Sequence, residues 1–110
     1  MKYKEGWTET ERAEANAKVK ALTEANTIKT PSQRGGTSAF ARYKKANGAD
    51  AVPPGKDVDH SIDLKLGGAD DILNMNPLDR SVNRSLGKQI QNKIKDYPYG
   101  TIFDKFKIGD

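Results

Sequence analysis

Residues 57 to 84 read DVDHSIDLKLGGADDILNMNPLDRSVNR, and this stretch decides the fold. Its valine and isoleucine content at 57–62 predicts a short strand, although Asp59 and His60 are not residues that a strand uses for packing. The glycine pair at 67–68 predicts a turn, and 72–74 can form the returning strand. The stretch therefore predicts two antiparallel strands joined by a glycine turn.

A helix is expected directly after the second strand. Asp79 or Ser81 can cap it, and apolar residues then recur at steps of four. These apolar residues are Val82, Leu86, Ile90 and Ile94. The side opposite to them carries Arg84, Lys88, Gln91 and Lys95. One side is thus expected to pack, while the other presents positive charge that suits a phosphate backbone.

The remaining chain is expected to support this unit. Thr8 and Glu11 form a capping box for a helix at 9–24, and 26–37 reads as loop. A short helix at 38–46 would turn Phe40 and Tyr43 toward the core. The domain organisation that we predict is one folding unit with three parts: an N-terminal helical scaffold at 1–52, a core at 53–97, and a C-terminal tail at 98–110 that packs on the core.

Composition limits the class of protein and of metal site. The 110 residues suffice for one domain, and Leu, Ile, Val and Phe make up only 20 of them, which predicts a folded domain of marginal stability. With no cysteine and one histidine, a thiolate or multi-imidazole zinc site is excluded, so oxygen must hold any metal. No apolar run is long enough for a membrane span, and the first residues lack the apolar segment of a signal peptide.

Charge is distributed in blocks. Residues 57–79 carry six aspartates against one lysine, whereas 29–45 and 80–95 each hold five basic residues and no acid. An acidic centre between basic arms suits a cation site under a polyanion such as nucleic acid. The alternative is ordinary solvated surface charge.

The polar residues at the strand and helix junctions form a candidate site. Asp59 at the strand end and Asn83 in the first helical turn could meet on one side of a cleft and hold an ion through oxygen, which suits Mg²⁺. His60 would point to the other side and accept a proton from water at neutral pH. Asp57 is expected to be a turn residue rather than a ligand, and Asp63 is either a third carboxylate near the ion or solvent-exposed.

Other residues would assist this site. The amide of Asn74 can tie the loop between the strands to itself and hold the His60 backbone in place. The residues expected to contact nucleic acid through their positive charge are Arg34, Arg80, Arg84, Lys88 and Lys95.

At these positions the sequence resembles the HNH endonuclease family, whose fold is called ββα-metal. The residues that carry the resemblance are Asp59-His60, Gly67-Gly68, Asn74-Met75-x-x-Leu78 and Val82-Asn83. The resemblance implies a small α+β domain with a ββα-metal core and additional N-terminal helices, His60 and Asn74 as catalytic residues, and one Mg²⁺ held by Asp59 and Asn83. Many members have histidine where this chain has Asn83, and cysteines for a structural zinc. Their absence favours Mg²⁺ or Mn²⁺ over Zn²⁺.

The segment from Pro53 to Ile90 is also similar to nuclease toxin domains at the C-termini of bacterial polymorphic toxins. The expected function is therefore a divalent-metal-dependent DNA endonuclease, active as a monomer in the cytoplasm of a target bacterium after delivery within a larger secreted protein. An acidic cognate immunity protein is the expected protein partner. The alternatives are a ribonuclease toxin and a non-catalytic nucleic-acid-binding module.

Overall fold

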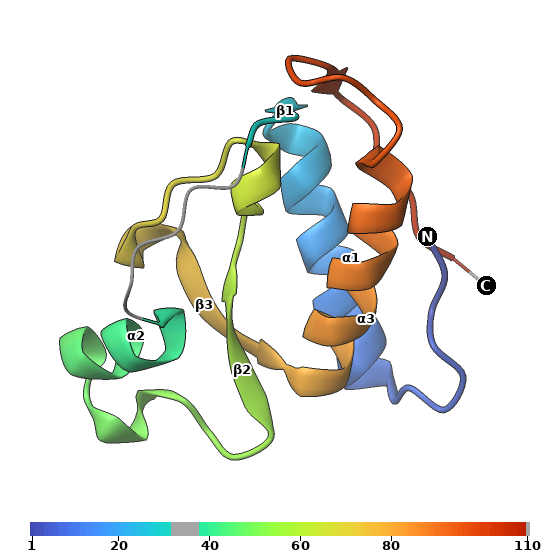
Figure 1. Cartoon of the computed structure of the whole chain (residues 1–110). Helices are drawn as coiled ribbons and strands as arrows, with labels where there is room; N and C mark the ends of the chain where they lie inside the picture. The colour runs from blue at the N-terminus through green and yellow to red at the C-terminus, as the bar shows by residue number, and fades with distance from the viewer. Residues whose placement is uncertain (32–37, 110) are drawn as a thin grey trace.

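A β-hairpin stands between α2 on one side and the packed pair α1 and α3 on the other (Figure 1). The computed structural model describes residues 1–31 and 38–109. In these ranges the chain is an α+β domain with three α-helices and two small antiparallel sheets. The helices are α1 (Glu9–Glu24), α2 (Ala39–Asn47) and α3 (Arg80–Ile94). The strands are β1 (Thr27–Ile28), β2 (Lys56–His60), β3 (Met75–Asp79) and β4 (Ile102–Phe103).

Helix α1 begins and ends where the sequence predicts. The Thr8 hydroxyl accepts the backbone N–H of Glu11, and the Glu11 carboxylate accepts the N–H of Thr8, so the capping box is confirmed. The buried side of the helix is formed by Ala15, Lys18, Val19 and Leu22. A lysine therefore occupies one position of an otherwise apolar stripe.

Strands β2 and β3 pair antiparallel along their full lengths, with Lys56 opposite Asp79 and His60 opposite Met75. The first strand is close to the predicted one, but the returning strand lies later than expected. Residues 72–74 form the 3₁₀ turn η3 (Ile72–Asn74), because the Asp71 carboxylate accepts the backbone N–H of Leu73 and starts a turn there.

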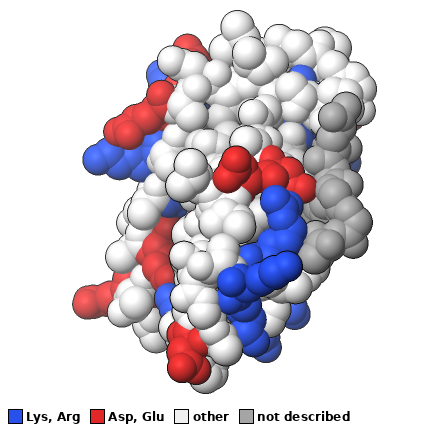
Figure 2. All heavy atoms as spheres, turned by 90° about the vertical axis from the view of Figure 1, so that its left-hand side faces the viewer, with Lys and Arg blue, Asp and Glu red and all other residues white. Residues whose placement is uncertain are grey.

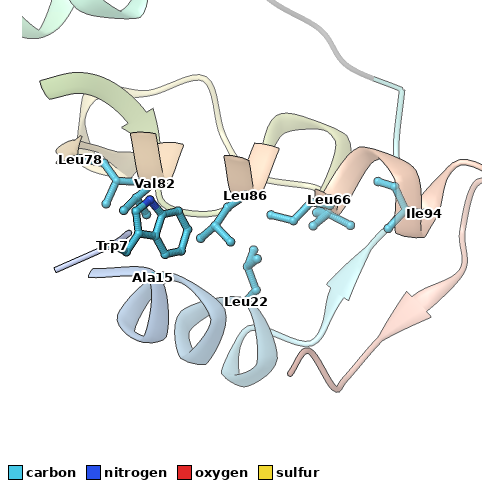
Figure 3. Close-up of a cluster of buried hydrophobic side chains, with 9 residues drawn as sticks. Trp7, Ala15, Leu22, Leu66, Leu78, Val82, Leu86 and Ile94 are labelled. Carbon is cyan, nitrogen blue, oxygen red and sulfur yellow. The ribbon is translucent and has the colours of Figure 1, made fainter. Parts of the chain in front are cut away.

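Helix α3 follows β3 without a linker, since Asp79 ends the strand and caps the helix by accepting the N–H of Val82. The predicted apolar stripe of α3 is confirmed, and its four members are buried. They pack against α1 and the N-terminal segment, where Trp7 and Leu22 contribute (Figure 3). Each fully buried aliphatic side chain contributes about 1.5–3 kcal/mol. This core joins α1 and α3 into one layer.

The loop between β2 and β3 requires both of its glycines. Gly67 ends the 3₁₀ turn η2 (Leu64–Leu66) with a φ of 84°, in the left-handed region. A Cβ atom on Gly68 would collide with the carbonyl of Ile62 and would lie 2.9 Å from the Asn74 amide nitrogen. The loop can fold back on itself only because Gly68 has no side chain.

The two ends of the chain lie together. Strand β1 pairs with β4, so Thr27 stands opposite Phe103, and Lys2 forms an isolated parallel bridge with Gly109. The amino group of Met1 donates to the carbonyl of Lys107 at 2.8 Å. Partly buried side chains from 98–110 pack on the core, namely Phe103, Phe106 and Ile108.

Phe40, which was expected in the core, is exposed instead. Phe40 is 45% exposed, and no residue of α2 is buried. Ile102 is exposed because successive residues of a strand face opposite sides, and its neighbour Phe103 takes the inner side. None of the helices in the described ranges is long and apolar enough to cross a membrane.

Candidate functional site

The two faces of β2 carry different side chains. Strand alternation places Asp57 and Asp59 on one face and Val58 and His60 on the other. The hydrogen bonds agree with this division: Asp57 and Asp59 reach side chains of α3 and α1, whereas His60 reaches Asp70, which in turn contacts α2. The predicted base and the predicted metal ligands therefore lie on opposite faces of the strand.

His60 is held by a carboxylate that the sequence did not single out. Its Nε2 lies 3.0 Å from Asp70 Oδ1, and the side chain is only 8% exposed. Arg42 of α2 donates to the same oxygen at 2.9 Å and to the Asp70 carbonyl at 3.0 Å. In the tautomer in which Nε2–H donates to Asp70, Nδ1 keeps its lone pair. Nδ1 is then the atom that can accept a proton.

Asn74 fastens the loop between the strands. Its carbonyl oxygen accepts the N–H of Ile62 at 3.0 Å, and its amide nitrogen donates to the carbonyls of Ile62 and Ala69, both at 2.9 Å. The backbone carbonyl of Asn74 also accepts the N–H of Ser61, the residue after His60. All of these contacts are with the loop, and they fix the backbone on which His60 and Asp70 sit.

Asp59 is paired with a buried lysine of α1. Lys18 Nζ donates to the carboxylates of Asp59 and Asp63 and to the carbonyls of His60 and Ser61, at distances between 2.5 and 3.0 Å. The Lys18 side chain is 5% exposed. Burial raises the pKa of Asp59, and the negative charge of Asp63 adds to the rise, against the opposing charge of Lys18. An internal ammonium group thus holds the end of β2.

Asn83 contacts Asp57, not Asp59. Its amide nitrogen donates to Asp57 Oδ2 at 2.8 Å, and the Nε atoms of Arg80 and Arg84 each lie 3.3 Å from the same carboxylate. Burial alone would raise the pKa of Asp57, but the hydrogen bonds from these three side chains and the charge of Arg84 outweigh it and lower the pKa.

Asn83 is therefore hydrogen-bonded to Asp57, while its pairing with Asp59 across a metal ion stays a prediction, and the strand register explains the contact with Asp57. Lys56 stands opposite Asp79, the cap of α3, so the first turn of α3 lies beside the start of β2. Asp59 is two residues farther along the strand than Asp57, which is about 6–7 Å. Asp57, expected to be only a turn residue, takes the place beside Asn83.

The donor chemistry of this face suits a hard cation. Carboxylate and amide oxygens are the protein ligands that Mg²⁺ prefers, and Mg²⁺ needs only one or two of them besides water. Two carboxylates and one amide meet this requirement here, with Asp57 rather than Asp59 in contact with Asn83. Within residues 1–31 and 38–109 no group of three or more histidine, aspartate or glutamate side chains is placed to hold a metal.

The basic residues of α3 lie on its exposed side. Arg80, Arg84 and Lys88 are exposed, as is Lys95 at the C-terminal cap of the helix. Arg34 lies outside the described residues. Figure 2, which looks onto the side where α2 lies in Figure 1, shows basic and acidic side chains next to one another on that face. The ion pairs of Asp70 with Arg42 and of Asp57 with Arg80 and Arg84 join the acidic and basic blocks of the sequence.

Lys18 was not predicted as a site residue, although its position in the sequence carries a recognisable signal. Lys18 falls at the helical spacing of Ala15 and Leu22, and a lysine in such a stripe must be paired when buried. Asp70 and Arg42 had no comparable signal, because the acids of the loop are adjacent and α2 has several basic residues.

A comparison of the chain with protein-family models, with curated proteins and with solved structures finds no match.

Proposed function

We propose that the protein is a nuclease in which His60 accepts a proton from the attacking water. The observation that carries the proposal is the contact of His60 Nε2 with Asp70, because it leaves the other ring nitrogen as the base and holds the ring in one orientation. The order of a hairpin followed directly by a helix is the ββα order of the HNH family that the sequence resembles. The finer assignment to a ββα-metal core is part of this proposal.

A divalent metal would complete the site. Asn83 with Asp57 or Asp59 would hold it, and a bound Mg²⁺ supplies positive charge that stabilises the phosphodiester as it is cleaved. Arg80 and Arg84 lie beside these ligands and supply further positive charge for the phosphates.

DNA is the substrate that we propose, with RNA as the alternative within the same class, because the site has no feature that distinguishes the two sugars. The toxin role, delivery to a bacterial cytoplasm and an acidic immunity protein remain part of the proposal. They are supported by the resemblance and by the net charge of +4.

A non-catalytic nucleic-acid-binding module is the second candidate. It is favoured by the burial of the His60 ring and by the ion pair that already neutralises Asp59. Such a module would use the exposed basic side of α3 and would leave the bound strand intact.

The two candidates are separated by incubating plasmid DNA and a folded RNA with the protein, with Mg²⁺ and with a chelator. We expect Mg²⁺-dependent cutting of DNA that falls about 10²–10⁴-fold in His60→Ala. Val58→Ala is the control, since Val58 lies on the same face of β2 and has no polar group. DNA that is shifted but uncut would support the binding module, and metal-independent cutting of RNA would overturn the main proposal.

The metal ligands are tested by following cutting against Mg²⁺ concentration in Asp57→Asn and Asp59→Asn. We expect Asp57→Asn to need the larger increase in Mg²⁺, because Asp57 contacts Asn83 whereas Lys18 already neutralises Asp59. An increase confined to Asp59→Asn would restore the ligand pair that the sequence suggested.

A further inference from the structure

A cavity of about 290 Å³ lies beside the candidate site, between the end of β2 and helix α3. One wall is formed by residues 59–60 and 63–65, and the other by residues of α3 from Gly87 to Ile94. Its volume is just below the range of roughly 300–1,000 Å³ for small-molecule pockets. Since Asp59 and His60 line it, a molecule in this cavity would touch the candidate site.

Gly87 has no role that the fold itself explains. It is exposed in the interior of the 15-residue helix α3, where glycine is unfavourable relative to alanine. Its φ is outside the left-handed region, and a Cβ atom built on it would meet nothing within 4 Å. Neither backbone conformation nor packing requires a glycine here, and because Gly87 lines the cavity, its missing side chain leaves this part of the wall open.

The lining of the cavity matches the parts of a nucleotide. Leu64, Ile90 and Ile94 are buried and give it an apolar floor, while Lys65 and Gln91 are exposed and place an ammonium and an amide at its rim. Asp59 and Asp63 also line the cavity, and both carboxylates accept hydrogen bonds from the Lys18 ammonium group, which offsets their negative charge. A nucleobase has apolar faces with hydrogen-bonding edges, and the phosphate attached to its sugar is an anion.

We propose that this cavity binds one unpaired nucleotide of a nucleic acid strand. The base lies on the apolar floor against the backbone of Gly87, and Lys65 meets the phosphate. The identity of the ligand rests on the proposed function, whereas the requirement for an open wall at Gly87 rests on the helix alone.

Two substitutions at Gly87 test the proposal, with Asn92→Leu as the matched control. Asn92 is exposed on the same helix and does not line the cavity. The probe is a fluorescein-labelled 12-nucleotide single-stranded DNA, whose binding is followed by anisotropy with a chelator present so that no strand is cut. Melting temperatures of all variants are measured in the same buffer.

Gly87→Ala and Gly87→Leu are expected to raise the melting temperature by a few degrees, since both residues favour a helix more than glycine does. Gly87→Leu should nevertheless weaken binding of the probe at least tenfold, with a smaller loss for Gly87→Ala. Asn92→Leu should bind as the wild type does. A more stable protein that binds less well is a result that a purely structural glycine cannot produce.

The proposal is overturned if Gly87→Leu binds the probe as the wild type does, or if Asn92→Leu loses as much affinity as Gly87→Leu. It is also overturned if the wild type does not bind the probe, or if it binds a duplex of the same sequence equally well. The outcome is distinguishable from that of the nuclease proposal. A wild type that binds the probe and cuts nothing contradicts only the nuclease proposal. A Gly87→Leu variant that cuts DNA with an unchanged KM contradicts only the role of the cavity.

Discussion

The two sides of the β2–β3 hairpin are held in different ways. On one side, α1 and α3 form the apolar core, and the buried Lys18 ties the strand end to α1. On the other side, α2 buries no residue and is linked to the loop after β2 by the pair Arg42–Asp70. We therefore expect the first side to stabilise the hairpin and the second to orient the His60 ring. Substitutions on the two sides should therefore affect different properties of the protein, and by different amounts.

The largest loss of stability is expected from Lys18→Met. Removing the ammonium leaves two carboxylates and two carbonyls without their donor, and breaking a buried ion pair from one side costs about 3–5 kcal/mol. Urea unfolding followed by the fluorescence of the single tryptophan, Trp7, measures the free energy of unfolding. Lys20→Met, on the exposed side of the same helix, should change it by less than about 0.5 kcal/mol. A loss below about 1 kcal/mol for Lys18→Met would show that solvent satisfies the carboxylates.

Next in size is the difference between Leu86→Ala in α3 and Phe40→Ala in α2. Leu86 is fully buried, so its truncation should cost about 2–5 kcal/mol. Phe40 is 45% exposed and belongs to a helix that buries no residue, so its removal should cost less than about 0.5 kcal/mol. The same unfolding measurement compares them. Equal losses would mean that α2 is part of the core, which contradicts the division between the two sides.

A smaller effect is expected from Arg42→Ala, because the pair that it forms with Asp70 is only partly buried. The global loss should be about 1 kcal/mol. Amide hydrogen exchange should become faster in α2 while α3 is unchanged, since the pair holds α2 and not the core. Lys45→Ala, in the last turn of α2, is the control. Faster exchange in α3 as well would show that the two sides are not independent.

The smallest effect concerns the pH dependence of Asp57. Its pKa is lowered on folding, so the carboxylate stabilises the protein above pH 3.8, and this stability is lost as the pH falls through the lowered pKa. Asp57→Asn should therefore lower the free energy of unfolding at pH 7, by less than about 1 kcal/mol because both arginines are exposed. The difference between the two proteins should vanish at a pH below the folded pKa. A difference that persists in acid would mean that shape, not charge, is responsible.

Local signals in the sequence were sufficient for α1 and α3. The capping box at Thr8 and the four apolar residues of α3 depend only on neighbours in the chain, and both were predicted correctly. The returning strand was misplaced because Asp71 can start either a turn or a strand, and the choice depends on the loop that Asn74 closes. Phe40 was misplaced because periodicity shows that a helix has an apolar side and not whether anything covers it.

Spacing in the sequence selected several residues of the candidate site but not their hydrogen-bond partners. His60, Asn74 and Asn83 were identified from spacing, but the partners of His60 and Asn83 depend on strand register and on loop geometry. A sequence gives no distance between Asp70 and His60, which are ten positions apart and meet only because two glycines fold the loop back. For the same reason Lys18, 41 positions before Asp59, could be recognised as unusual without its partner being known.

The contact between the two ends of the chain has a consequence for the order of folding. The bridge of Lys2 with Gly109 and the pairing of β1 with β4 close loops that span most of the chain, and contacts of such long range form late. A ribosome that is still making residue 100 holds a chain in which Phe103 and Phe106 are not yet available to cover the core. These contacts therefore form only after residue 109 has been synthesised.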